Sequence, residues 1–138
     1  QYLSNLNRDV TVEDSQILAS LALADLADYI TTVYDQNFAL IRYAESLAVS
    51  TATFSQAEAQ LNSPILTDFY KPLLQNIFQQ TSGNTLFCIS IPFPGTFVSS
   101  LFTAKQIRSH YKNQAAMSFG GGYINTELRN ITDTKLLI

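Results

Sequence analysis

The stretch Leu86-Phe-Cys-Ile-Ser-Ile-Pro-Phe-Pro-Gly95 is the part of the sequence that decides the expected fold. Residues 86–93 are almost continuously apolar, β-branched or aromatic, which is typical of a strand covered on both faces. Pro92 and Pro94 end the strand, because proline has no N–H to donate to a neighbouring strand. In such a strand, Cys88 is expected to be a buried and chemically inert thiol.

The residues after this strand predict a β-α-β unit. Apolar residues at helical spacing indicate a helix over 97–111, and a second strand over 115–119 leads into Gly120-Gly-Gly122. Two strands joined in this way are parallel and connected by a right-handed crossover. The loops 92–96 and 120–125 are then expected at the same carboxyl edge of the sheet, where open α/β sheets bind their ligands.

The chain before residue 81 is expected to be helical. Apolar residues recur at helical spacing in four segments, which are 15–33, 35–49, 54–61 and a stretch that starts at Ser63-Pro64. Asp14 or Ser15 can cap the first helix. Pro72 must either kink the last helix or restart it. The apolar residues of that last helix, Leu73 and Ile77 among them, are expected to pack against the β-α-β unit.

Length and composition favour one globular domain of the α/β class. The 138 residues are 46% hydrophobic and 14% charged, which indicates a chain that forms a core. The expected domain covers 1–138, with a helical lead-in over 11–80 and the β-α-β part over 81–138. The low charge, the absence of an initial Met and the apolar end Lys135-Leu-Leu-Ile138 suggest a fragment of a longer chain.

The charges and the apolar runs of the sequence argue against nucleic-acid binding, membrane contact and a metal site. The net charge is −3 and the eight Lys and Arg residues are scattered, so nucleic-acid binding is not expected. No signal peptide is visible and no apolar run approaches the ~18 residues of a membrane span, so a cytoplasmic protein without membrane contact is expected. Asp25, Asp28 and Asp35 are interpreted as a solvated helix face rather than a metal cluster.

Gly120-Gly-Gly122 is the strongest local candidate for a binding site. Three glycines after a strand allow a ligand to approach the bare main chain, and a flat or anionic cofactor fits such a loop. A loop that only has to turn sharply explains the glycines equally well. Ser90 can donate a hydrogen bond to a ligand at the same edge or bond to neighbouring main chain. His110, the one histidine, is expected to face solvent or to cap its helix, and no catalytic residue is assigned.

The ordered string Ser90-Ile-Pro-Phe-Pro-Gly95, Lys105-Gln-Ile-Arg108 and Ser118-Phe-Gly-Gly-Gly-Tyr-Ile-Asn-Thr-Glu-Leu-Arg129 resembles the N-terminal cobalamin-binding-type domain of B12-dependent radical SAM proteins. The resemblance covers about 86–134 and extends more loosely over 15–80. It implies a Rossmann-like domain that holds a corrinoid, or a degenerate version of one. In that family a strand serine and a glycine pair line the pocket for the nucleotide tail, and Ser90 and Gly120-Gly121 match them in order.

The sequence also departs from the family pattern. The Asp-x-His-x-x-Gly motif that supplies a lower axial histidine is absent, and so is the Cys-x-x-x-Cys-x-x-Cys motif of the 4Fe–4S cluster. The resemblance therefore implies that the cluster, S-adenosylmethionine cleavage and catalysis belong to a radical SAM barrel elsewhere in a parent polypeptide, which would be the partner of this part. Three interpretations stay open: a cobalamin-binding accessory domain, a docking or structural domain without a corrinoid, and a helical sensor-like domain.

Overall fold

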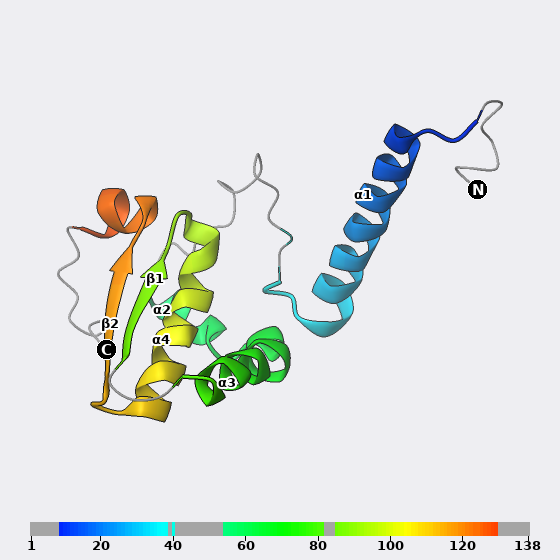
Figure 1. The fold of residues 1–138 in the computed structure, drawn as a ribbon. Helices are drawn as coiled ribbons and strands as arrows, with labels where there is room; N and C mark the ends of the chain where they lie inside the picture. The colour runs from blue at the N-terminus through cyan, green and yellow to red at the C-terminus, as the bar shows by residue number, and fades with distance from the viewer. Residues whose placement is uncertain (1–8, 39, 41–53, 82–84, 130–138) are drawn as a thin grey trace. The chain divides into compact units, whose positions relative to one another are not determined.

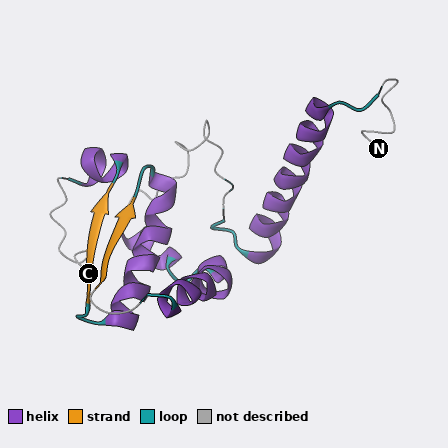
Figure 2. Ribbon diagram, viewed as in Figure 1, coloured by secondary structure: helices purple, strands orange, loops and turns teal. Residues whose placement is uncertain are grey.

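The structure, a computed structural model, describes residues 9–38, 40, 54–81 and 85–129, and the chain divides into two compact units, Gln1–Leu40 and Ile41–Ile138. Figure 1 shows the elements along the chain, and Figure 2 distinguishes helices from strands. Most of the helix predicted over 35–49 lies outside the described residues. Its described beginning is a turn, in which the Phe38 N–H donates to the Asp35 carbonyl at 2.9 Å.

The first unit contains helix α1 (Val12–Tyr29), which continues as the π-helical turn η2 (Ile30–Tyr34). Thr11 caps α1 through a capping box with Asp14. The Asp14 N–H donates to Thr11 Oγ1 at 3.2 Å, and Asp14 Oδ2 accepts the Thr11 N–H at 2.9 Å. The expectation that Asp14 or Ser15 caps this helix is therefore wrong. Asp14 is the third residue of the helix, and its carboxylate accepts the main-chain N–H of the cap residue Thr11.

Apolar side chains lie around much of α1 and are exposed. Val12–Tyr34 is the one helical stretch in the described part of the chain that is long and apolar enough to span a membrane, judged by length and composition. This corrects the expectation that no apolar stretch reaches that length. Core helices and signal sequences meet the same criterion, so the cytoplasmic location stays a prediction.

Where the structure describes it, the second unit is mostly helical and contains one parallel two-stranded sheet, so the α/β class is confirmed at this level. In chain order its elements are α2 (Phe54–Gln60), η3 (Ile65–Tyr70), α3 (Lys71–Gln79), β1 (Thr85–Ser90), η4 (Pro94–Thr96), α4 (Phe97–Tyr111), β2 (Ala115–Gly120) and η5 (Ile124–Leu128). Helices α2 and α4 have the bounds that apolar spacing predicts, within one residue.

The chain does not break its helical course at Pro72, and only the type of helix changes there. The π-helical turn η3 ends at Tyr70, and α3 begins at Lys71 with Pro72 in its first turn. Across the boundary the Lys71 N–H donates to the Leu66 carbonyl, so η3 and α3 form one continuous helix. The helical type therefore changes immediately before the residue that has no N–H to donate.

Strands β1 and β2 are adjacent and parallel, as the sequence predicts. Their register pairs Thr85 with Ala115 at one end and Ser90 with Gly120 at the other. The regular strand ends at Ser90, three residues before the predicted boundary, although Ile91 still donates its N–H to the Gly120 carbonyl at 2.7 Å. The hand of the crossover through α4 stays a prediction.

Helix α4 forms the centre of the unit. It packs against β2 on one side and against α2 and α3 on another (Figure 1). Its buried side chains therefore point in several directions and join the core of the unit. That core consists of Ala57, Leu61, Leu66, Leu74, Phe78, Ile91, Phe97, Leu101, Phe102, Ile107, Tyr111 and Ala115.

The sheet is covered on one face only by the described part of the chain, so the expectation of cover on both faces is wrong there. Burial alternates along β1. Phe87 and Ile89 are partly buried and pack against the core, whereas Leu86, Cys88 and Ser90 on the other face are exposed. Cys88 is thus an exposed thiol rather than a buried one. An apolar run predicts a strand, but it does not show whether a layer lies on each side.

Candidate functional site

The carboxyl ends of β1 and β2 lie side by side and carry the predicted site. Ser90 pairs with Gly120 in the register. Beyond this pair, the Ile91 N–H donates to the Gly120 carbonyl at 2.7 Å, and the Tyr123 N–H donates to the Ile91 carbonyl at 3.2 Å. The two loops that follow the strands are therefore tied together at one edge, as the β-α-β pattern predicts.

Gly121 is required by the fold itself. Its φ angle is +103°, which side chains of L-amino acids rarely adopt, and a Cβ atom added there would lie 2.6 Å from the main-chain oxygen of Ile91. Gly121 is therefore the point at which the second loop crosses the end of β1. The sharp-turn explanation of the glycines accounts for this residue without any ligand.

Gly120 has no such structural reason to be glycine. A Cβ atom added at Gly120 would meet no atom within 4 Å, whereas one at Gly122 would lie 3.3 Å from the Pro92 carbonyl oxygen. The space beside Gly120 is open, and its register partner is Ser90. Of the three glycines, Gly120 is the one that leaves room for a ligand next to a hydroxyl group.

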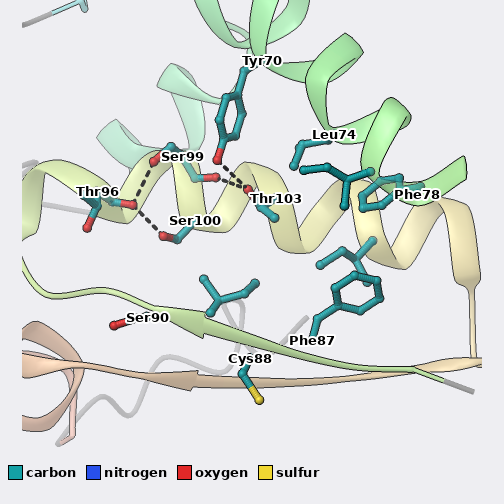
Figure 3. Close-up of a pocket in the computed structure, with 13 residues that line it drawn as sticks. Tyr70, Leu74, Phe78, Phe87, Cys88, Ser90, Thr96, Ser99, Ser100 and Thr103 are labelled. Atoms are coloured by element: carbon teal, nitrogen blue, oxygen red, sulfur yellow. Dashed lines mark hydrogen bonds between the residues drawn. The ribbon is translucent and has the colours of Figure 1, made fainter. Parts of the chain in front are cut away.

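Ser90 also lies at one end of a cleft between β1 and the helices. The cleft has a volume of about 390 Å³ (Figure 3). An apolar wall from α3 faces the inward side chains of β1, and α4 contributes hydroxyl groups. The thirteen residues that line it are Tyr70, Leu74, Ile77, Phe78, Phe87, Cys88, Ile89, Ser90, Thr96, Ser99, Ser100, Thr103 and Ile107. None of them is a charged residue, so the cleft has no group that would neutralise a phosphate or a carboxylate.

The hydroxyl groups of α4 in this cleft donate to the main chain. Ser99 and Ser100 both donate to the Thr96 carbonyl, at 3.0 and 2.7 Å, and Thr103 donates to the Ser99 carbonyl at 2.8 Å. Their hydrogens are therefore engaged, and they offer a ligand only oxygen lone pairs. From the sequence alone, Ser99 and Ser100 are expected to be ordinary residues of a helix surface, but Ser100 is buried. The signal that could have found them is their spacing from Thr103 on one side of α4.

The other candidate residues lie away from this edge or act locally. His110 is exposed near the end of α4, at the opposite edge of the sheet, with its ring centroid 5.2 Å from that of Phe78. Asp25 and Asp28 are exposed as expected, but Asp35 is buried and accepts the Asn37 N–H at 2.9 Å. Among the described residues, no three His, Cys, Asp or Glu side chains gather closely enough to hold a metal ion.

Comparison with protein-family models, curated proteins and solved structures finds no match to this chain. The geometry of the carboxyl edge and the motifs that form it are therefore the features of this chain that point to a function.

Proposed function

We propose that the unit β1-α4-β2 is a Rossmann-like cofactor module that holds a corrinoid at its carboxyl edge, as an accessory part of a larger radical SAM enzyme. The observation that carries the proposal is the pairing of Ser90 with Gly120 at that edge, with open space beside the glycine. These are two of the positions at which the resembling family lines its nucleotide-tail pocket.

The residues present fit a corrinoid in two respects. The space at Gly120 would be filled by any side chain, so glycine at this position keeps the edge accessible. Ser90 is exposed and can donate a hydrogen bond to a polar group of the cofactor. The third matching residue, Gly121, supports the site indirectly, because its conformation sets the path of the loop beside it.

The residues of the chain indicate which part of the reaction it could support and which part would belong to a partner. A bound corrinoid supplies a cobalt centre that can carry an alkyl group or exchange an electron, and the protein positions it. Axial ligation by a histidine of this edge is not expected, since His110 lies at the far end of α4. The single cysteine cannot hold an iron–sulfur cluster, so cluster and S-adenosylmethionine chemistry would belong to the partner barrel.

A docking or structural domain without a corrinoid is the second candidate. The observation that favours it is Gly121, because its positive φ and its close approach to Ile91 explain a glycine by folding alone. In this case the glycine-rich loop is retained for the fold, and Gly120 can be replaced without consequence. The two candidates therefore differ in what happens at Gly120.

Titration of the chain with hydroxocobalamin, followed by its visible spectrum, tests the proposal. We expect saturable binding that Gly120→Val weakens by about tenfold or more, since a branched side chain would occupy the open space. Ser90→Ala should weaken binding less, by about the value of one hydrogen bond. His110→Ala should leave the bound spectrum unchanged.

Ala116→Val is the matched control for Gly120→Val. It places the same side chain on the same strand and the same exposed face of β2, but opposite Leu86 rather than Ser90. Circular dichroism should show that all variants are folded. Equal affinity of wild type and Gly120→Val, or an absence of binding to the folded wild type, would favour the docking domain.

A further inference from the structure

We propose that the free edge of β1 binds an extended, uncharged segment of a partner polypeptide as an additional strand. In the described part of the chain the sheet consists of β1 and β2 alone, so one edge of β1 has no neighbouring strand. This inference does not depend on the corrinoid site, because it uses main-chain groups of β1 rather than the Ser90 side chain, although the two surfaces meet at Ser90.

The direction of the main-chain groups identifies the free edge. In a parallel pair of strands, the N–H and C=O groups of one residue point to the same side, and successive residues alternate. Both the N–H and the C=O of Ile91 bond to the β2 side, to Gly120 and Tyr123. By this alternation the N–H and C=O groups of Phe87 and Ile89 also point toward β2. Those of Leu86, Cys88 and Ser90 point away from it.

The cleft of about 390 Å³ lies alongside this edge. Cys88 and Ser90 both border it, and Figure 3 shows the Cys88 side chain pointing away from the helices, so its contribution to the cleft is main chain. Leu74, Ile77 and Phe78 of α3 line the opposite side of the cleft. Ile77 is 54% exposed although it belongs to the apolar wall. An added strand would continue the sheet beneath the helices and cover this residue.

The chemistry of the cleft defines the partner segment. Donors and acceptors at strand spacing select an extended peptide, because only a peptide main chain offers the complementary groups at the same interval. Leu86 to Ser90 spans five residues, so the segment is about five residues long. Without a charged lining residue, side chains of the partner that point toward α3 must be uncharged, and branched apolar residues suit a strand.

Amide hydrogen exchange of the full chain tests the proposal with a defined probe, the acetylated and amidated peptide Thr-Val-Thr-Val-Thr. In the free chain, the Cys88 and Ser90 amides should exchange at least about tenfold faster than those of Ile89 and Ile91. At saturating peptide, exchange at Cys88 and Ser90 should slow by about tenfold. A twin peptide N-methylated at alternate residues keeps the side chains and loses the donors, and it should give no protection.

Two variants of the chain locate the contact. Cys88→Pro removes an N–H that faces the free edge and should abolish protection of Ser90 by the peptide, whereas Cys88→Val retains the N–H and should preserve it. Equal protection by both peptides, or by neither, would overturn the proposal even if Cys88→Pro fails to fold. A dimer that forms with increasing concentration and is lost in Cys88→Pro would also overturn it, since the edge would then belong to a second copy of the chain.

Discussion

Helices α1 and α4 are both rich in apolar side chains, but the structure gives them opposite surroundings. In α1, Leu23 and Leu26 are 55% and 54% exposed, whereas in α4, Phe102 and Ile107 are 4% and 1% exposed. The difference does not come from composition alone, because α1 is long and apolar enough to meet the criterion of a membrane-spanning helix. It comes from position: α4 lies between a sheet and other helices of its own unit.

This comparison shows which interactions form each helix. The first turn of α1 is organised by the local capping box of Thr11 and Asp14, which needs no other element of the fold. Helix α4 has no side-chain cap at Thr96, whose hydroxyl donates instead to the Phe93 carbonyl at 2.9 Å. Long-range packing therefore stabilises α4, while local bonds set the beginning of α1.

The largest expected effect is the loss of stability when a core side chain of α4 is truncated, and a truncation in α1 is the comparison. Phe102→Ala should destabilise the chain by about 3–5 kcal/mol, because it leaves a cavity where α4 meets Tyr70, whose ring centroid lies 6.2 Å away. Leu26→Ala in α1 should change stability by less than about 0.5 kcal/mol. Denaturant unfolding of the two variants measures both values, and similar losses would show that α1 is covered in solution.

A second pair of substitutions sharpens the comparison within one helix. Leu73 and Leu74 are neighbours in α3, but Leu73 is 59% exposed and Leu74 only 6%. Leu74→Ala should cost about 2–5 kcal/mol of unfolding free energy. Leu73→Ala should cost less than about 0.5 kcal/mol. A reversed order would mean that the face of α3 observed here is not the buried face in solution.

The same pair shows how far the sequence determines the fold. Spacing of apolar residues predicts the helix around Leu73 and Ile77, and it predicts the bounds of α4 and the parallel pairing of β1 with β2. It places Leu73 and Ile77 in the core, and this part is wrong, because Leu74 and Phe78 are the buried residues of α3. The π-helical turn η3 precedes Pro72 and changes the angular phase of every residue after it. Apolar spacing counted through Pro72 cannot include that change.

The candidate site was predictable as a location but not in its details. The order of strand, helix and strand places Ser90 and Gly120 at one edge, since parallel strands end together. The difference between Gly120 and Gly121 lies in the φ angle of Gly121 and in what a Cβ atom at each position would meet, which no local pattern encodes. The cleft was missed for the same reason, because its walls come from α3, β1 and α4, which are distant in the sequence.

The two glycines supply the third prediction. Gly121→Ala should destabilise the chain by about 2–3 kcal/mol, since alanine disfavours a φ of +103° and its methyl group would collide with the Ile91 main chain. Gly120→Ala has open space and should stay within about 0.5 kcal/mol of wild type. Thermal unfolding distinguishes them, and equal melting temperatures would show that the loop can take another path.

The smallest expected effect concerns the cap of α1. Thr11→Ala removes the hydroxyl that accepts the Asp14 N–H and leaves the Asp14 carboxylate with one bond fewer, since Thr11 Oγ1 also donates to Asp14 Oδ2 at 2.8 Å. The expected loss is about 1 kcal/mol of local helix stability, which corresponds to about fivefold faster amide exchange in the first turn. Thr11→Ser keeps the hydroxyl and should exchange like wild type. Because this cap is local, unfolding of the unit that contains α4 should be unchanged in both variants. A shift of that transition in Thr11→Ala alone would show that α1 contributes to the stability of the second unit, and the contrast between a locally formed helix and a helix held by packing would then fail.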